Sequence, residues 1–309
     1  MAELFLGIVL SVPTRACVVD TSGCVKGRGF SGRNIVWDYD GAIKSIAEVA
    51  AEAVSEAGAS LSDIKMICVT FSNPDSEDGH SWTDDLVRRA LGDAPFVTSD
   101  HVSAAHAAAF GDGDGIVVVA SDDSEALGAK EGKYARAGGW GDVFGGEGTV
   151  YRIMTQGLRV AARHADGRGD RTAMLADYCS LLNCSPRRLP YRIHDKHVSY
   201  MALCEVVFRC ADAEDLPASR VLHGEARELV SMAKAVAGRL EMLSPRLSVI
   251  GRCFDSPVFL DVFRRCTREE LPDASVEVCD RTTVEGAAIL AKMEASSSED
   301  PRPADGPVL

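Results

Sequence analysis

Hydrophobic and polar positions along the chain follow two periods, and the order of these periods repeats once. Near the N-terminus, short apolar runs alternate with turn residues (ELFLGIVL, RACVVD and CVKGRGF), a pattern typical of three consecutive β-strands. Residues 39–58 place apolar side chains at helical spacing, and a strand, a helix and another strand follow up to residue 100. The first part of the chain therefore has the predicted order βββαβαβ.

The same order returns after a predicted helix over residues 101–111. Three short strands are predicted within residues 115–139, and a strand, a helix, a strand and a helix close the pattern between residues 247 and 294. A mostly helical stretch separates these two parts. We therefore predict an α/β fold built from two copies of one unit.

The repeat predicts two lobes and a tail. Residues 1–101 form the first lobe, and a helix over residues 282–295 can pack back on it. Residues 102–295 form the second lobe, with a helical insertion over residues 150–243. Residues 296–309 have no apolar periodicity, which predicts a disordered tail.

Composition narrows the functional classes. The chain has 309 residues, 46% of them hydrophobic, and a formal net charge of −13. An acidic chain of this kind argues against a nucleic-acid groove or an anionic membrane surface, because both require clustered Lys and Arg. No stretch is apolar for long enough to span a bilayer, and the N-terminus lacks the basic start of a secretory signal. We expect a cytoplasmic protein that binds a small molecule.

Ten cysteines are scattered along the chain without CxxC spacing, and several lie inside apolar strand or helix patterns. This distribution predicts reduced thiols in the core rather than a metal site or a disulfide framework. They are Cys17, Cys24, Cys68, Cys179, Cys184, Cys204, Cys210, Cys253, Cys266 and Cys279.

One segment is unusually rich in glycine. RAGGWGDVFGGEGT, residues 136–149, contains six glycines, one tryptophan and two acids, and a helical pattern follows directly. Glycine clusters persist where the backbone must adopt positive φ or where another group approaches it closely. The segment predicts an ordered loop that leads into a helix N-terminus, which is a place that attracts anions.

Five segments in order resemble the N-acetylglucosamine kinases and the related BadF/BadG-type ATPases, over residues 4–293. ARAGGWGDVFGGEGTVY is similar to the family's A-R-A-G-G-W-G-x-x-x-G-D-E-G-S-x-Y pattern. The others are GRGFSGRNI, TSDHVSAAHAAAFG, VIGRCFDSPVFLDVF, which is similar to the adenosine-loop pattern G-G-x-x-x-S-x-x-L, and VEGAAILA. The resemblance implies the two-lobed actin, hexokinase and Hsp70 fold, a duplicated ribonuclease H-like unit around a cleft.

The resemblance also implies roles for particular residues. Asp100 stands where the family places the general base that accepts the proton of the attacking sugar hydroxyl. Asn34 matches the substrate-binding asparagine of G-x-x-N. The glycine-rich segment lines the substrate cleft in these kinases, and here it supplies Gly138, Gly139, Trp140, Gly141, Gly145, Glu147 and Gly148.

Both phosphate-binding loops depart from the family pattern. The first loop, D-G-G-G-T-K/R in the family, is SVPT here (Ser11 to Thr14), without an acid for Mg²⁺ and with a proline that removes one amide donor. The second, G-T-G-S in the family, is SDDS: Ser121, Asp122, Asp123 and Ser124. Each of its carboxylates would repel a nearby phosphate by roughly 4 kcal/mol. Gly146 replaces the aspartate of the family's G-D-E-G.

Other polar groups are also candidates for site residues. The loop over residues 72–82 carries Asp75, Asp78, His80 and Trp82, and its position beside the expected cleft makes Asp75 and His80 candidates for substrate contact. The HDKH stretch, residues 194–197, has no third ligand at fixed spacing, so we predict no metal site there. His101 and His106 lie on an alanine-rich helix, for which simple packing is the favoured interpretation.

Three function hypotheses follow. In the first, Asp100 activates a nucleophile on a small molecule, and a phosphate or sulfate ester on that molecule replaces ATP as the electrophile, by intramolecular displacement or elimination. In the second, the chain is a non-catalytic pseudokinase subunit of a heteromeric assembly. In the third, it is an active kinase for an N-acetylhexosamine-like molecule, and only then are ATP and Mg²⁺ cofactors. The resemblance favours a homodimer, or a heterodimer with a related subunit.

Overall fold

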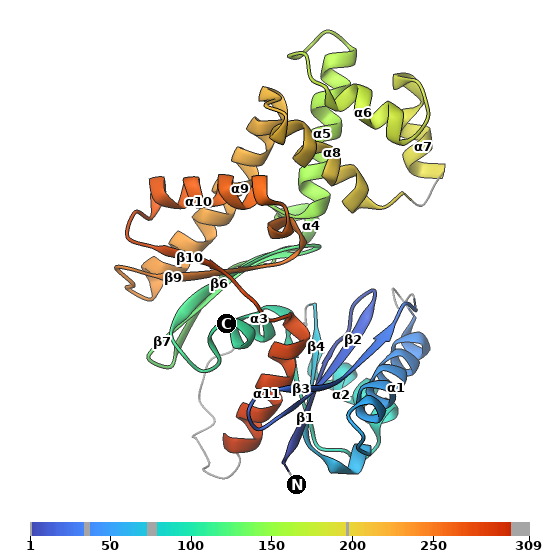
Figure 1. Ribbon diagram of the computed structural model, residues 1–309, viewed down its shortest axis with the longest axis vertical. Coiled ribbons are helices and arrows are strands. Elements are labelled where there is room, and N and C mark those ends of the chain that lie inside the picture. Colours follow the sequence, from blue (N-terminus) through green and yellow to red (C-terminus); the bar gives the residue numbers. More distant parts are fainter. Residues whose placement is uncertain (1, 34–37, 73–78, 196–197, 298–309) are drawn as a thin grey trace. The chain divides into compact units, whose positions relative to one another are not determined.

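A computed structural model of the protein describes residues 2–33, 38–72, 79–195 and 198–297. The chain divides into two compact units, one made of Met1–Gly113 with Cys279–Leu309 and the other of Asp114–Val278. Each unit contains one five-stranded sheet with helices packed on it (Figure 1).

The sheet of the first unit has the strand order β3-β2-β1-β4-β5. The first three strands form an antiparallel meander, whereas β4 runs parallel to β1 and to β5. The elements of this unit are β1 (Leu4–Val9), β2 (Thr14–Asp20), β3 (Val25–Ser31), α1 (Tyr39–Glu56), η1 (Leu61–Asp63), β4 (Ile64–Phe71), α2 (Gly79–Leu91), β5 (Phe96–Asp100), α3 (His101–Phe110) and α11 (Thr283–Ser297).

Both faces of this sheet are covered, which explains why its central strands are almost entirely apolar. Leu6 and Ile8 of β1 belong to a core shared with α1 and α2, whereas Phe5 belongs to a second core that includes α11. Side chains alternate between the two faces because successive residues of a strand point in opposite directions. Figure 1 shows α11 and α3 lying together at this sheet.

The sheet of the second unit has the order β10-β9-β6-β7-β8. Its meander is β6-β7-β8, and β9 lies parallel to β6 and to β10. The elements are β6 (Gly115–Ala120), β7 (Ser124–Lys130), β8 (Lys133–Gly138), α4 (Gly141–Phe144), α5 (Val150–Ala165), α6 (Met174–Leu181), η2 (Pro186–Arg188), α7 (Leu189–Asp195), α8 (Tyr200–Asp212), α9 (Leu216–Arg239), β9 (Arg246–Ile250), η3 (Arg252–Asp255), α10 (Pro257–Glu270) and β10 (Ser275–Val278).

The two sheets have the same topology. In each, the first strand of the meander is central, the second and third strands lie on one side, and the two later parallel strands lie on the other. The duplicated βββαβαβ order that the sequence predicts is therefore present in the structure. The inserted helices α5 to α9 stand between β8 and β9 of the second unit.

The division between the units falls after Gly113 rather than at residue 101. The reason is that α3 packs closely against α11, the helix that closes the first unit. A Cβ atom added to Gly286 of α11 would lie 1.9 Å from the carbonyl oxygen of Ala104 in α3. This close approach of two helix backbones holds α3 in the first unit.

The cysteines of the described residues form no disulfide, and Cys17, Cys68, Cys204, Cys210, Cys253 and Cys266 are buried. Burial raises the pKa of the Cys17 thiol to about 12. Cys24 is exposed, in contrast to the expected core position. Within the described residues, no helix combines the length and apolarity that crossing a bilayer requires.

The glycine at position 286 provides a test of this packing. We expect Gly286→Val to lower the free energy of unfolding by about 1–3 kcal/mol or more, because a branched side chain cannot enter the contact with α3 without backbone shifts. Urea denaturation measures the change. Gly238→Ala in α9 is the matched control: nothing lies within 4 Å of the added atom, so stability should stay or rise by up to about 1 kcal/mol. Equal behaviour of the two variants would contradict the packing.

Candidate functional site

Three parallel strands of the first unit end at the same edge of the sheet. Val9 at the end of β1 lies opposite Thr70 of β4, and Phe71 at the end of β4 lies opposite Asp100 of β5. Beyond the last residue of β1, the Leu10 N–H donates to the Thr70 carbonyl at 3.0 Å. Neighbouring strands are about 4.8 Å apart, so the β1–β2 turn and Asp100 lie about 10 Å apart. Open α/β sheets bind ligands at such an edge.

Asp100 is the last residue of β5 and the N-cap of α3. Its carboxylate accepts a hydrogen bond from the Ser103 N–H at 2.6 Å. This bond fixes the carboxylate at the carboxyl edge of the sheet. The capping role and a role as general base are therefore compatible, and the structure shows the first of them.

His101 follows Asp100 and lies over the ends of the neighbouring strands. Its Nδ1 is 3.2 Å from the Ser72 hydroxyl. Burial lowers the pKa of the imidazole below its usual 6.5, whereas the Thr70 carbonyl, the Asp100 charge and the Leu10 carbonyl oppose that shift. His106, one turn further along α3, is buried against the Phe110 ring at 5.2 Å, as the packing interpretation expects.

The β1–β2 turn directs its hydroxyl groups toward its own backbone. Ser11 Oγ donates to the Pro13 carbonyl at 2.8 Å, and Thr14 Oγ1 donates to the Ser11 carbonyl at 2.9 Å. Ser45 of α1 then donates to Thr14 Oγ1 at 3.0 Å. Pro13 has no N–H, so this turn lacks the run of free amides that cradles a phosphate.

The corresponding turn of the second unit, between β6 and β7, is acidic. Its backbone closes through a hydrogen bond from the Ser121 N–H to the Asp123 carbonyl at 3.0 Å. Burial raises the pKa of the Asp123 carboxyl, and the charges of Asp122 and Asp142 raise it further. Three carboxylates therefore share the region where a phosphate would need positive or dipolar partners.

Arg252 lies across this turn and was not predicted from the sequence as a site residue. Its guanidinium forms an ion pair with the Asp122 carboxylate, and its Nε is 3.4 Å from Ser121 Oγ. Gly251 holds the loop against β6, since an added Cβ would lie 2.3 Å from the Ala120 carbonyl oxygen. The sequence feature that could have pointed to Arg252 is the segment GRCFDS, in which this arginine replaces the second glycine of the G-G-x-x-x-S pattern.

The glycine-rich segment packs closely against α9. Gly148 has a φ of +77°, and an added Cβ would lie 2.5 Å from Leu229; at Gly138, with φ +90°, it would lie 2.8 Å from the Met232 sulfur. The Gly148 N–H also donates to the Glu225 carboxylate at 2.8 Å. Bare backbone is therefore needed here because a helix approaches it. Contact of these glycines with a substrate stays a prediction.

The start of α5 is capped by protein groups. The Val150 N–H donates to the Ser121 carbonyl at 2.9 Å, and the Arg152 N–H donates to Thr149 Oγ1 at 3.1 Å. Gly146, where the family has aspartate, has a φ of +77°, and an added Cβ would lie 3.3 Å from Asp142 Oδ1. An aspartate at this position would place two carboxylates side by side.

Large apolar side chains stand out from the same segment. Trp140 is 75% exposed, and Val143 and Phe144 on α4 are 90% and 86% exposed. Exposed apolar patches mark binding surfaces more often than ordinary protein surface. The half-buried Glu147 lies beside them, 3.3 Å from the position of an added Gly145 Cβ.

Three predicted site residues, Asn34, Asp75 and Asp78, lie outside the described part of the chain. His80 lies in α2, but its side chain is among those that the structure does not describe. Asp100 belongs to the first unit and the glycine-rich segment to the second, so their meeting in one cleft stays a prediction. Across the described ranges no group of three or more His, Cys, Asp or Glu side chains is arranged to hold a metal ion.

Comparisons with known proteins agree with this fold. The model of the BadF/BadG/BcrA/BcrD ATPase family matches residues 11–291. The N-acetylmuramic acid/N-acetylglucosamine kinase of Clostridium acetobutylicum is 27% identical over 255 residues, which cover 80% of this chain and 83% of that protein. The sequence resemblance to this family and the duplicated α/β fold are thereby confirmed.

Solved structures support the same fold. A protein from Chromobacterium violaceum assigned as an N-acetylglucosamine kinase matches with a TM-score of 0.76 and 15% identity, over 94% of this chain and 99% of that one. A ROK family glucokinase from Streptomyces griseus, solved with glucose and AMPPNP, matches with a TM-score of 0.63 and 17% identity over the same shares. The fold is therefore that of hexokinase-like sugar kinases.

The environment of His101 predicts a pH dependence of stability. Because its pKa is lowered on folding, the folded protein binds fewer protons than the unfolded chain just below pH 6.5. The free energy of unfolding should therefore fall as the pH drops from about 7.5 to about 5.5. In His101→Gln, the free energy of unfolding measured by urea denaturation should change less with pH over this window. An equal pH dependence in both proteins would mean that the pKa of His101 does not change on folding.

Proposed function

Because the chain belongs to the BadF/BadG/BcrA/BcrD ATPase family, we propose that it acts on a small molecule with Asp100 as general base, and that it no longer transfers phosphate from ATP. The observation behind this proposal is an asymmetry between two sets of groups. The carboxylate that serves a nucleophile is held at the carboxyl edge of its sheet by Ser103, whereas both turns that would serve a nucleotide have changed chemistry.

The proposed reaction needs an electrophile other than ATP. A substrate that carries a phosphate or sulfate ester can supply it. Asp100 takes a proton from an amine or hydroxyl of the substrate, and the freed lone pair attacks the carbon that bears the ester. The new bond closes a ring, while the C–O bond breaks and its electrons leave with the phosphate or sulfate. In the elimination, Asp100 would take a proton from a neighbouring carbon, the electrons of the C–H bond would form a double bond, and the same anion would leave. Alignment of the two groups lowers the barrier.

The changed turns support the loss of nucleotide chemistry. Phosphoryl transfer depends almost wholly on positioning and charge stabilisation of the phosphates. In the first turn, Pro13 removes one amide donor, and the Ser11 and Thr14 hydroxyls donate to carbonyl groups of the turn itself. In the second, carboxylates replace amide donors, and the Arg252 guanidinium is engaged by Asp122. These residues do not fit an ATP–Mg²⁺ complex, so no step is assigned to one.

We further propose that the working form includes a second subunit, either another copy of the chain or a related one, and that it resides in the cytoplasm. Trp140, Val143 and Phe144 support the partner, because burying three such side chains would remove a large apolar area from water. We expect Phe144→Asp to lower the assembly mass measured by light scattering. An unchanged mass, for a wild-type protein that is oligomeric, would remove this surface from the interface.

An active small-molecule kinase is the second candidate. The observation that favours it is the 27% identity to an N-acetylmuramic acid/N-acetylglucosamine kinase over most of both chains. In that case Asp122 and Asp123 would hold Mg²⁺ to offset their repulsion of the phosphates. The non-catalytic subunit is the outcome that remains if neither chemistry is found.

Nucleotide affinity separates the first two candidates. We expect titration calorimetry to show no binding of ATP–Mg²⁺ tighter than about 1 mM. The triple variant Asp122→Thr, Asp123→Gly, Arg252→Gly should bind more tightly than the wild type, because it removes two carboxylates and restores the residues that the family pattern has at these three positions. Micromolar affinity of the wild-type protein would favour the kinase.

Two substitutions at position 100 test the base. The substrate is first identified by mass spectrometry of the small molecule that co-purifies with the protein. We then expect Asp100→Asn and Asp100→Ser to lower turnover by about 10²- to 10⁴-fold, since both residues still cap a helix but neither accepts the proton. Unfolding midpoints and substrate affinity should stay close to those of the wild type.

Asp215→Asn is the control for loss of a capping carboxylate. Asp215 caps α9 through the Ala218 N–H at 3.0 Å, outside the proposed site. Turnover should stay near the wild-type rate in this variant. Full activity of Asp100→Asn would reduce Asp100 to a helix cap and remove it as the general base.

A further inference from the structure

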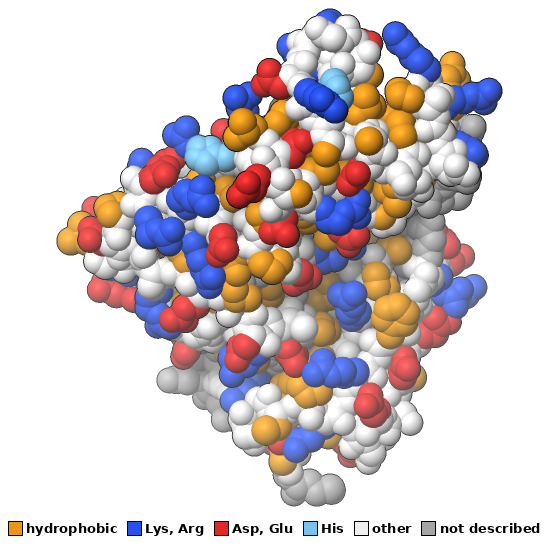
Figure 2. All heavy atoms as spheres, turned by 45° about the horizontal axis from the view of Figure 1, so that its top comes forward, with side chains coloured by type: hydrophobic (Ala, Val, Ile, Leu, Met, Phe, Trp, Pro, Cys, Tyr) orange, Lys and Arg blue, Asp and Glu red, His pale blue; other side chains and the backbone are white. Residues whose placement is uncertain are grey.

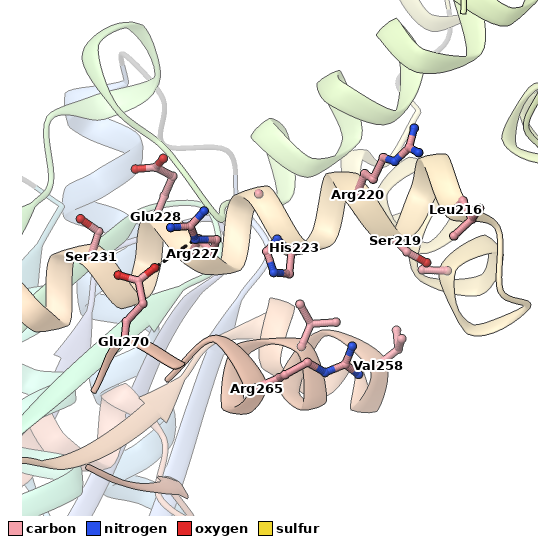
Figure 3. Close-up of a pocket in the computed structure, with 13 residues that line it drawn as sticks. Leu216, Ser219, Arg220, His223, Arg227, Glu228, Ser231, Val258, Arg265 and Glu270 are labelled. Carbon is pink, nitrogen blue, oxygen red and sulfur yellow. Dashed lines mark hydrogen bonds and ion pairs between the residues drawn. The ribbon is translucent and has the colours of Figure 1, made fainter. Parts of the chain in front are cut away.

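A groove runs between α9 and α10 of the second unit, and none of its lining residues belongs to the site proposed above. Its volume is about 620 Å³, within the range of small-molecule sites. Val258 and Val262 of α10 and Ala211 at the end of α8 provide an apolar floor. Figure 3 shows the two helices on facing sides of the groove.

The charge of this groove differs from that of the whole chain. Arg220, Arg227, His223 and Arg265 line it, against Glu228 and Glu270, whereas the chain as a whole has a net charge of −13. Figure 2 shows that acidic and basic side chains are otherwise interspersed over the visible face of the molecule. Three arginines against two glutamates leave one surplus positive charge in the lining, which in an acidic protein favours an anionic ligand.

Two of these cationic side chains are already engaged. Arg227 pairs with Glu270 at 3.0 Å, and Arg220 pairs with Asp170 at 2.6 Å. Figure 3 shows Arg220 and Glu228 turned away from α10, whereas His223 points toward that helix. Within the described parts of the chain, neither His223 nor Arg265 has a hydrogen-bond or ion-pair partner. These two side chains come from facing helices and line the same groove.

Gly224 keeps the groove open. A glycine inside a helix costs about 1 kcal/mol relative to alanine, so its presence needs a reason. At Gly157 of α5 the reason is packing, because an added Cβ would lie 2.5 Å from the Tyr178 hydroxyl. At Gly224, which lines the groove, nothing lies within 4 Å of an added Cβ. Packing therefore does not require this glycine, and its effect is open space beside His223.

We propose that this groove is a second ligand site, and that it binds a small organic oxyanion, a phosphate ester or a carboxylate. The Arg265 guanidinium, whose planar fork matches either group, and the His223 ring donate to the anion. Val258 and Val262 contact the apolar part of the ligand. The space beside Gly224 accommodates it.

Binding of fragment probes tests this site. Phenyl phosphate and benzoate carry the two anion types on one apolar ring, and benzyl alcohol is the uncharged counterpart. We expect NMR titration to detect one or both anions but not the alcohol, with shifts confined to α9 and α10. The tighter of the two probes identifies the natural anion as phosphate or carboxylate.

Variants give the proposal a sharp signature. Arg265→Met should weaken anion binding at least about tenfold, which is the effect of one charge-assisted contact. Gly224→Leu should abolish binding while the unfolding midpoint stays or rises, because leucine fills the groove and favours the helix. Arg268→Met, an exposed arginine of α10 outside the groove lining, is the control and should bind as the wild type does.

Three results would overturn the proposal. The first is the absence of anion binding at about 10 mM probe, which excludes a Kd in the low millimolar range. The second is binding that persists in both Arg265→Met and Gly224→Leu. The third is displacement of the bound probe by ADP, because α10 follows the loop that resembles an adenosine loop, and competition would make the groove part of a nucleotide site.

Discussion

The parallel pairing of β4 with both β1 and β5 determines where the candidate catalytic groups of the first unit lie. This register brings the end of β1, the end of β4 and Asp100 to one edge of the sheet, although Val9 and Asp100 are separated by 91 residues in the sequence. The hydrogen bond from the Ser103 N–H then holds the Asp100 carboxylate in place. Without that pairing, Asp100 would be an ordinary helix cap far from any turn that could face a ligand.

The same topology in the second unit places the β6–β7 turn in the position that corresponds to the β1–β2 turn. Both turns lack the glycine-rich backbone of the family pattern, and they differ from it in different ways. The first turn is closed by hydroxyl groups and proline, whereas the second carries carboxylates and has Arg252 across it. An exposed ion pair of this kind contributes little to stability, typically about 0–1 kcal/mol. Its main consequence is therefore the charge that it presents at this turn.

The element order and the duplicated topology could be predicted from the sequence. A strand or helix with one buried face repeats its apolar residues every 2 or 3.6 positions, and this pattern is visible within each short segment. The boundary at Gly113 could not be predicted in this way. It depends on α3 meeting α11 through Gly286, a residue about 180 positions away. The order of strands and helices contains no information on which unit holds the helix between them.

For the site, too, local features could be predicted from the sequence, whereas contacts between distant segments could not. Asp100 could be placed at a strand end from the local pattern, whereas the reason for Gly148 depends on Leu229 of α9. Arg252 shows the same limit, since its ion pair with Asp122 joins loops 130 residues apart. The groove at Gly224 was missed because an open space beside a helix has no periodic signature.

Turnover without nucleotide tests the central claim most directly. The co-purified substrate is incubated with protein that has been treated with apyrase to remove ATP and ADP, and released phosphate or sulfate is measured together with the organic product. The account predicts that product forms at the same rate as with untreated protein and that one anion is released per product molecule. Added ATP–Mg²⁺ should have no effect on this rate. Product that forms only with ATP, accompanied by an equal amount of ADP, would contradict it and establish the chain as a kinase.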